Sequence, residues 1–205
     1  NGPAGLKMAE RETPDLVFLD IKMPQMDGLE VLKLLKDQEG APPVVILSGH
    51  GSVKTAVAVR QGAPAPTIDS AAALRAALLG AEALYLPDAT RSTAGAHVAA
   101  MLDRLGIREA LAPRLRMYAN GATAMRALAE GGESGALGCT QATEIRYTPG
   151  IVLVGALPAP FALATVYSAA LGAAAHAGAA AQRFVDLLAG PASAALRRAG
   201  GFDER

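Results

Sequence analysis

The chain has 205 residues, and its 19 Lys and Arg balance 19 Asp and Glu, so the formal net charge is zero. This balance excludes the clustered basic surplus of a nucleic-acid-binding face, and no nucleic-acid partner is predicted. The single cysteine, Cys139, excludes an internal disulfide and is predicted to be a small buried apolar side chain. No run of about 18 uninterrupted apolar residues predicts a membrane span.

The first predicted strand covers residues 15–20, where consecutive apolar residues end at Asp20. The carboxyl end of such a strand is the place where open α/β sheets collect ligands and chemistry. The following segment contains a Pro and an Asp-Gly pair and predicts a loop, after which leucines recur at helical spacing. A second strand is predicted over 43–48, ending in the hydroxyl of Ser48, and the Gly-His-Gly run at 49–51 predicts a flexible loop.

Residues 3–56 resemble the receiver domain of bacterial two-component response regulators of the nitrogen-regulation type, because of the string DIKMPQMDG that begins at Asp20. The resemblance implies that Asp20 is the phosphoacceptor and that Ser48 contacts the phosphoryl group. A receiver also needs an acidic pair for Mg²⁺ and a Lys on its fifth strand, and neither is recognisable here. We therefore expect Asp20 to be weakly reactive at best, with Mg²⁺ as a cofactor only if the receiver site is active.

The rest of the chain alternates predicted strands and helices. Residues 52–60 fit either a helix or a strand, and 61–68 form a Pro/Gly-rich connector. The alternation over 69–155 predicts an α/β fold with a mostly parallel sheet. From residue 162 to the end the sequence predicts helix throughout, with Phe202 buried at the close of an amphipathic series.

Four segments in order carry a second resemblance: VAVRQGAPAPTIDSAAALRAALLGAEALYLPD, STAGAHVAAMLDRLGI, NGATAMRALAEGGESGALGCTQATEI and RFVDLLAGPASAALRRAGGF. Together, residues 57–202 resemble periplasmic substrate-binding proteins of ABC importers, and the molybdate-binding family in particular. The resemblance implies two α/β lobes that hold an oxyanion between them. Residues 64–157 resemble the second lobe, and the C-terminal helices, 160–202, would return to the first.

The sequence is thus interpreted as a hybrid α/β protein of three-layer αβα lobes. A partial receiver domain of the flavodoxin-like type, 1–57, is joined to a domain resembling a type II periplasmic binding protein, 58–205. The receiver fragment stands where the opening strands of the first lobe, with their oxyanion-binding serines, would be. An engineered chimera, a recombined gene and a wrongly assembled reading frame all fit the join near Thr55–Val59.

Candidate ligand contacts come from the second resemblance and from helix chemistry. Oxyanions in such lobes are bound by backbone N–H groups and hydroxyls at helix N-termini. The alternative interpretation of these helix-start residues is ordinary N-capping. Molybdate-binding proteins often carry a Tyr where this chain has Gln141, so the sequence departs from that family at this position. The candidates are Ser92, Thr93, Ala94 and Gly95, then Asn120, Gly121 and Ala122, and finally Gln141, which follows Thr140 at a strand end. No histidine has a second ligand at metal spacing, so no metal site is predicted.

Three functions remain open from the sequence. The first is a non-enzymatic oxyanion-binding module fused to a truncated receiver and impaired in both activities, with an ABC permease or a histidine kinase as partner. The second is a receiver phosphorylated on Asp20, and the third is a structural chimera with neither activity. Residues 1–13 show no signal peptide, so the chain as it stands is expected in the cytoplasm, although its binding-protein half resembles periplasmic proteins.

Overall fold

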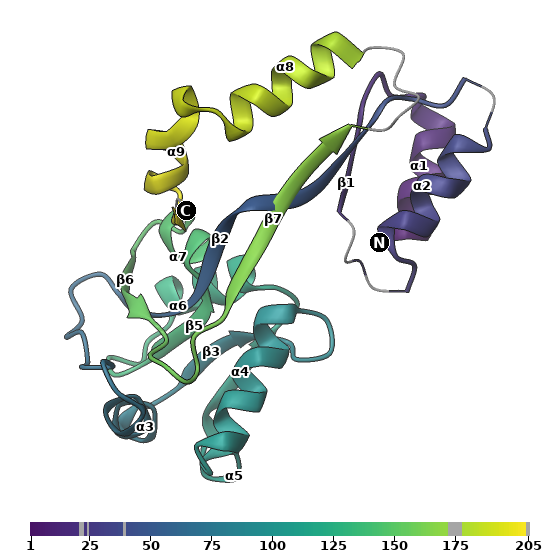
Figure 1. The fold of residues 1–205 in the computed structure, drawn as a ribbon. Coiled ribbons are helices and arrows are strands. Elements are labelled where there is room, and N and C mark those ends of the chain that lie inside the picture. Colours follow the sequence, from purple (N-terminus) through teal and green to yellow (C-terminus); the bar gives the residue numbers. More distant parts are fainter. Residues whose placement is uncertain (21–22, 24, 39, 172–177, 204–205) are drawn as a thin grey trace. The chain divides into compact units, whose positions relative to one another are not determined.

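A computed structural model describes residues 1–20, 23, 25–38, 40–171 and 178–203, with the side chains of all but 47–52, 165–171, 178 and 203. Ile21, Lys22, Pro24 and His176 therefore lie outside the described residues. The described chain divides into two compact units (Figure 1). Unit 1 contains 1–52 and 166–196, and unit 2 contains 53–165 and 197–203. The domains 1–57 and 58–205 rest on sequence resemblance and stay predictions.

Unit 1 has a small apolar core between two helices and a parallel strand pair. Helices α1 (Gly2–Glu12) and α2 (Gly28–Lys36) flank β1 (Val17–Asp20), which pairs in parallel with the first residues of β2 (Val44–Arg60). Helix α2 begins at a capping box, which explains why the sequence starts a helix there. The buried residues of this core are Leu19, Val31, Leu35 and Val44.

The C-terminal part of unit 1 packs on the same strand pair. Helix α8 (Gly178–Ala189) brings Phe184 against Phe18 of β1, with 5.4 Å between the ring centroids. The prediction of continuous helix after residue 162 is wrong, because β7 (Ala164–Leu171) is a strand that pairs with β2. The remaining elements are η2 (Pro191–Ser193), α9 (Ala194–Ala199) and β8 (Phe202–Asp203).

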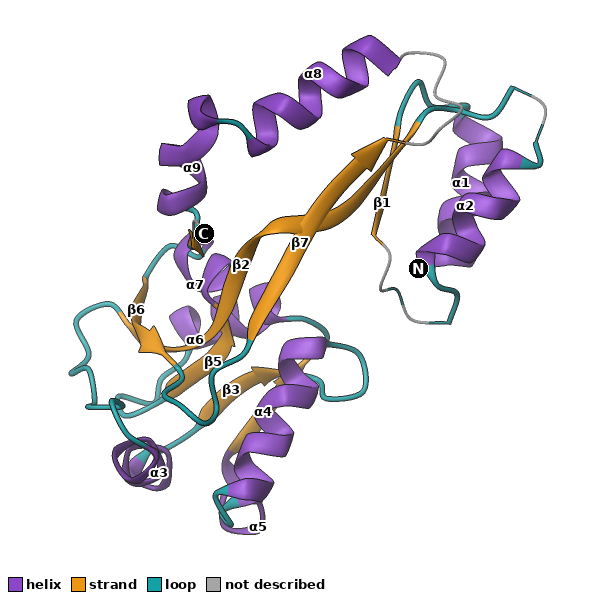
Figure 2. Cartoon of the chain, viewed as in Figure 1, coloured by secondary structure: helices purple, strands orange, loops and turns teal. Residues whose placement is uncertain are grey.

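Strand β2 is one continuous strand of 17 residues (Figure 2). The loop predicted at Gly49-His50-Gly51 is therefore wrong, and the ambiguous segment 52–60 is a strand. Pairing with neighbouring strands explains why both segments are extended, since β2 pairs with β1 in unit 1 and with β5 and β6 in unit 2. Glycine in the interior of a strand is locally unfavourable, so strand pairing and not local propensity accounts for the extended Gly-His-Gly run.

Unit 2 is built on a mixed sheet in the order β6-β2-β5-β3-β4. β5 and β4 both pair in parallel with β3, and β2 is antiparallel to both β5 and β6, so β3, β4, β5 and β6 run in one direction and the sheet is mostly parallel, as predicted for residues 69–155. The bounds of these strands are β3 (Leu84–Pro87), β4 (Leu115–Tyr118), β5 (Leu137–Gln141) and β6 (Ile151–Ala156).

Helices cover both faces of the unit 2 sheet (Figure 1). On one face, side chains of α3 (Ala71–Gly80) and α4 (Thr93–Arg104) share an apolar core with alternate residues of β3 and β5, such as Leu86 and Cys139. On the other face, Gly138 of β5 lies against α6 (Gly121–Glu130), and α7 (Ala142–Tyr147) follows β5 directly. The short α5 (Arg108–Leu111) and η1 (Ala112–Arg114) lead into β4.

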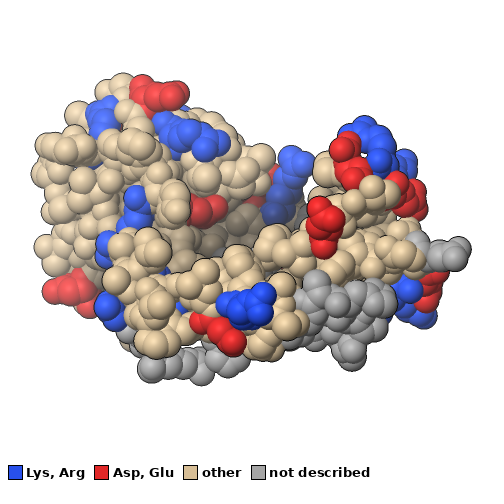
Figure 3. Space-filling view, turned by 90° about the horizontal axis from the view of Figure 1, so that it is seen from above, with Lys and Arg blue, Asp and Glu red and all other residues tan. Residues whose placement is uncertain are grey.

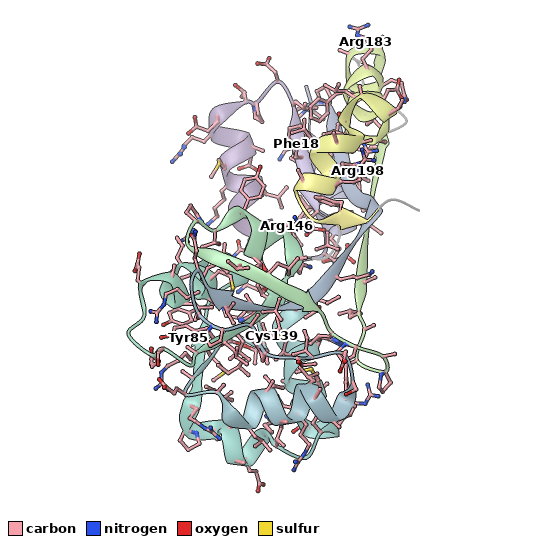
Figure 4. The ribbon with its side chains drawn as sticks, turned by 90° about the vertical axis from the view of Figure 1, so that its left-hand side faces the viewer. Phe18, Tyr85, Cys139, Arg146, Arg183 and Arg198 are labelled. Atoms are coloured by element: carbon pink, nitrogen blue, oxygen red, sulfur yellow. The ribbon has the colours of Figure 1, made fainter. Side chains whose placement is uncertain are left out.

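Two side-chain predictions can be compared with these elements. Cys139 is fully buried in β5, as expected (Figure 4). Phe202 is half-buried in β8 rather than buried.

Burial of Cys139 generates a prediction about alkaline pH. Burial raises the pKa of the Cys139 thiol from 9.0 to about 12, so the folded state favours the neutral thiol. Its contribution to stability is complete below the pKa of the unfolded chain and is lost as the pH rises towards the folded value. We expect the free energy of unfolding to fall between about pH 8.5 and 10, and to fall less in Cys139→Ala.

Chemical denaturation of both proteins across that window is the measurement. Burial also raises the pKa of Tyr85 to about 12, but an unfolded tyrosine titrates at about 10, so the lower window isolates the cysteine. Parallel stability curves for the two proteins would show that the thiol does not contribute.

Candidate functional site

Three parallel strands of unit 2 end at one edge of the sheet. The last residues of β3, β4 and β5 are Pro87, Tyr118 and Gln141. The turn after β3 is tied to the end of β4, because the Asp88 N–H donates to the Tyr118 carbonyl at 2.7 Å. Buried Thr55 of β2 lies opposite Gln141 in the antiparallel register, so it belongs to the same edge. Helices α4, α6 and α7 follow these three strand ends.

Helix α4 begins against the end of β3. Ser92 is its N-cap, and the Ser92 Oγ accepts a hydrogen bond from the Gly95 N–H at 3.3 Å. A Cβ on Gly95 would overlap the carbonyl oxygens of Pro87 and Asp88, so only glycine allows this approach. Thr93 is exposed and Ala94 is buried. The structure therefore places the predicted residues 92–95 at the strand edge, and their contact with a ligand stays a prediction.

Helix α6 begins at the same edge from the opposite face of the sheet. Asn120 is its N-cap, and the Asn120 Oδ1 accepts from the Thr123 N–H at 2.9 Å. A Cβ on Gly121 would overlap Thr140 Oγ1 and Glu144 Oε2, so glycine is again required. Ala122 is half-buried. The two predicted loops thus meet one edge of one sheet, where helices leave neighbouring strands on opposite faces, a common position for ligand sites.

The end of β5 brings the predicted Thr140-Gln141 pair beside Glu144, which the sequence did not single out. Thr140 is fully buried and its hydroxyl donates to Glu144 Oε2 at 2.5 Å. Glu144 lies in the first turn of α7, while the predicted Gln141 is half-buried and immediately precedes that helix. Glu144 could have been noticed as an acidic residue in a helical first turn. Thr140 is predicted as a candidate with Gln141, but its contacts with Glu144 and Gly121 depend on how α6 and α7 pack against β5.

Both acidic and basic side chains surround the edge. Hydrogen bonds from Thr90 hold the pKa of Asp88 below its usual range, and Asp88 Oδ1 accepts from the Thr90 hydroxyl at 2.6 Å. On α6, Arg126 donates to the Thr123 hydroxyl at 3.1 Å. The face of the molecule in Figure 3 likewise shows positive and negative side chains interspersed rather than gathered by sign. Any anion held at the edge therefore meets mixed charge.

The receiver-type residues lie on adjacent strands of unit 1. Asp20 is the exposed last residue of β1 and pairs with Leu47 of β2, next to Ser48. The Ser48 side chain lies outside the described residues, so its predicted contact with a phosphoryl group stays a prediction. Within the described part of the chain, no group of three or more His, Cys, Asp or Glu side chains could hold a metal ion. Of the histidines considered as metal ligands, His97 instead lies with its Nε2 at 2.8 Å from the Phe161 carbonyl oxygen.

A family model described as bacterial extracellular solute-binding protein matches residues 8–203. A substrate-binding domain assigned to a molybdenum ABC transporter of Clostridium difficile has a TM-score of 0.67 at 12% identity, covering 100% of this chain and 83% of that one. The periplasmic molybdate-binding protein of Azotobacter vinelandii has a TM-score of 0.52 at 16% identity, covering 85% of this chain and 83% of that one. These likenesses confirm the α/β fold class and the second resemblance.

The curated relatives match the other part of the hybrid. The DNA-binding transcriptional regulator NtrC of Proteus hauseri is 46% identical over 59 residues, which are 28% of this chain and 12% of that protein. NtrC of Escherichia coli strain K12 is 42% identical over 80 residues, 36% of this chain and 17% of that protein. The chain thus spans less than a fifth of these regulators, and the matches confirm the receiver resemblance. None of the described helices is long and apolar enough to cross a bilayer.

The close approach at Gly95 generates a prediction. Gly95→Ala should push the start of α4 away from β3 and destabilise the protein by about 1–3 kcal/mol, the usual cost of overpacking. The matched control is Gly80→Ala in α3, where a Cβ would meet nothing within 4 Å. This control should be neutral or stabilising, because alanine loses less backbone entropy. Equal melting temperatures for the two variants would contradict the packing argument.

Proposed function

Because the chain belongs to the bacterial extracellular solute-binding protein family, we propose that it binds a small oxyanion at the unit 2 strand edge. The observation that carries the proposal is the position of two helix starts, of α4 and α6, at one edge of one sheet. The names of two similar structures, a molybdenum transporter domain and a molybdate-binding protein, support this class of ligand.

Backbone N–H groups would supply the attraction. The first N–H groups of a helix have no intrahelical partner and carry the positive end of the helix dipole. At α4 the capping hydroxyl of Ser92 occupies the Gly95 N–H, which leaves the N–H groups of Thr93 and Ala94 for a ligand. At α6 the Asn120 side chain occupies the Thr123 N–H, which leaves those of Gly121 and Ala122. Gln141 is the third proposed contact, and an ABC permease is the proposed partner.

A proline at residue 93 tests this proposal by deleting one donor. Thr93 is the first helical residue of α4, where proline fits the helix, and Ser92 has the extended backbone that must precede a proline. Thr93→Pro should weaken oxyanion binding about tenfold, the effect of losing one hydrogen bond to a charged group. Thr93→Ala, which keeps the N–H and loses the hydroxyl, is the control and should bind nearly as the unmodified chain does.

Calorimetric titration with phosphate, sulfate and molybdate gives the dissociation constants. Melting curves of all three proteins report folding separately from binding. The proposal fails if no oxyanion binds, or if Thr93→Pro binds as tightly as Thr93→Ala.

A second candidate function is phosphorylation of Asp20, favoured by the exposure of Asp20 at the carboxyl end of β1. Within the described residues, no group of three or more His, Cys, Asp or Glu side chains could hold the Mg²⁺ that would neutralise the charge of an acyl phosphate. We expect no appreciable phosphorylation by acetyl phosphate with Mg²⁺. Intact-mass spectrometry is the measurement, and a mass increase of one phosphoryl group that disappears in Asp20→Asn would establish the receiver activity.

A further inference from the structure

The segment 197–203 belongs to unit 2, although the residues before it belong to unit 1, and it lies beside α7 (Figure 1). Gly201 makes the contact. A Cβ on Gly201 would lie 3.3 Å from both the Ala142 carbonyl carbon and the Thr143 nitrogen. The φ of Gly201 is +91°, which residues with a side chain rarely adopt. Glycine therefore suits both the turn and the close approach to the first two residues of α7.

The same segment is also attached to the sheet of unit 2. The Gly201 N–H donates to the Arg198 carbonyl at 3.1 Å, so the turn at Gly201 ends α9 and leads into β8. Strand β8 pairs with β2, the strand whose Thr55 lies opposite Gln141 of β5. The segment 197–203 is thus held by strand pairing and contacts α7 from that position.

Helix α7 depends on contacts of this kind. It has only six residues, and helices this short are marginal by themselves. Ala142 and Ile145 are buried, so packing holds the helix against the rest of unit 2. Gly201 meets α7 directly after Gln141, which is half-buried at the end of β5. A displacement of the segment 197–203 would therefore move the start of α7 and Gln141 with it.

We propose that the segment 197–203 is a strap that fixes the start of α7, and that Gly201 is a positioning residue for Gln141. The inference rests on the proposed function, in which Gln141 is the third contact with the oxyanion. Gly201 acts through α7 rather than by touching the ligand. Because the strap holds Gln141 in place before an oxyanion arrives, less conformational freedom is lost on binding.

Gly201→Ala tests the strap, because a methyl group at this position pushes the segment away from α7. Amide hydrogen exchange in α7 should become faster. Oxyanion binding should weaken by up to about tenfold, the effect of losing one hydrogen bond to a charged group. Gly62→Ala is the matched control, since Gly62 has a similar φ of +86° but a Cβ there would meet nothing within 4 Å. It carries the same backbone strain and should leave α7 exchange and affinity unchanged.

Titration calorimetry with phosphate, sulfate and molybdate and hydrogen-exchange mass spectrometry are the measurements. Gln141→Ala separates positioning from a merely structural role, because in that background Gly201→Ala should weaken binding no further. Gly201→Asn serves if the alanine variant fails to fold. Asparagine tolerates a positive φ better than alanine but still carries a Cβ, so it should also loosen α7 and weaken binding.

The inference is overturned if Gly201→Ala binds the oxyanion as tightly as Gly62→Ala, or if α7 exchanges equally fast in both. It is also overturned if Gly201→Ala weakens binding as much without Gln141 as with it. In these cases sensitivity to Thr93→Pro would leave the proposed function standing. If the unmodified chain binds no oxyanion, the proposed function fails and the role of Gln141 fails with it, while α7 exchange still decides whether the segment is a strap.

Discussion

The close contact between helix starts and strand ends is the constraint on which the unit 2 site depends. At Gly95 the space of a Cβ is filled by backbone carbonyls of the β3 end, and at Gly121 it is filled by side-chain oxygens of Thr140 and Glu144. Because neither glycine carries a side chain, the starts of α4 and α6 lie in close contact with these groups, which restricts the movement of their first N–H groups relative to the sheet. Donors fixed in this way need little rearrangement when a ligand arrives, which lowers the entropic cost of binding.

Two interaction energies can be compared for an anion near a helix start and a carboxylate. A helix terminus contributes about 0.3–1 kcal/mol to the binding of an anion. Two like charges about 4 Å apart near a protein surface repel by about 4 kcal/mol. The repulsion from one nearby carboxylate is therefore larger than the attraction of one helix terminus.

Local patterns were enough to predict the parts of the site that local chemistry builds. Ser92 and Asn120 cap their helices as the sequence indicated, because a capping side chain bonds within its own turn. The extended Gly-His-Gly run and the strand β7 could not be predicted in this way, since pairing with a distant strand decides them. The same holds for Glu144, whose carboxylate matters only because α7 packs beside α6.

Pairing with distant strands also explains how a receiver-like segment can stand inside a solute-binding protein. The family match runs through residues 8–203, across the point where the receiver resemblance ends. The receiver fold and the solute-binding protein fold both require this segment to form two parallel apolar strands that are joined and covered by a helix. β1, α2 and the start of β2 meet that demand with a buried core of their own. From Thr55 onward β2 pairs with β5 and β6 instead, and such ladders are made by the backbone N–H and C=O groups that every residue except proline provides in full. The fold thus constrains the apolar pattern of the segment, while Asp20 lies exposed at the end of β1, outside that buried pattern.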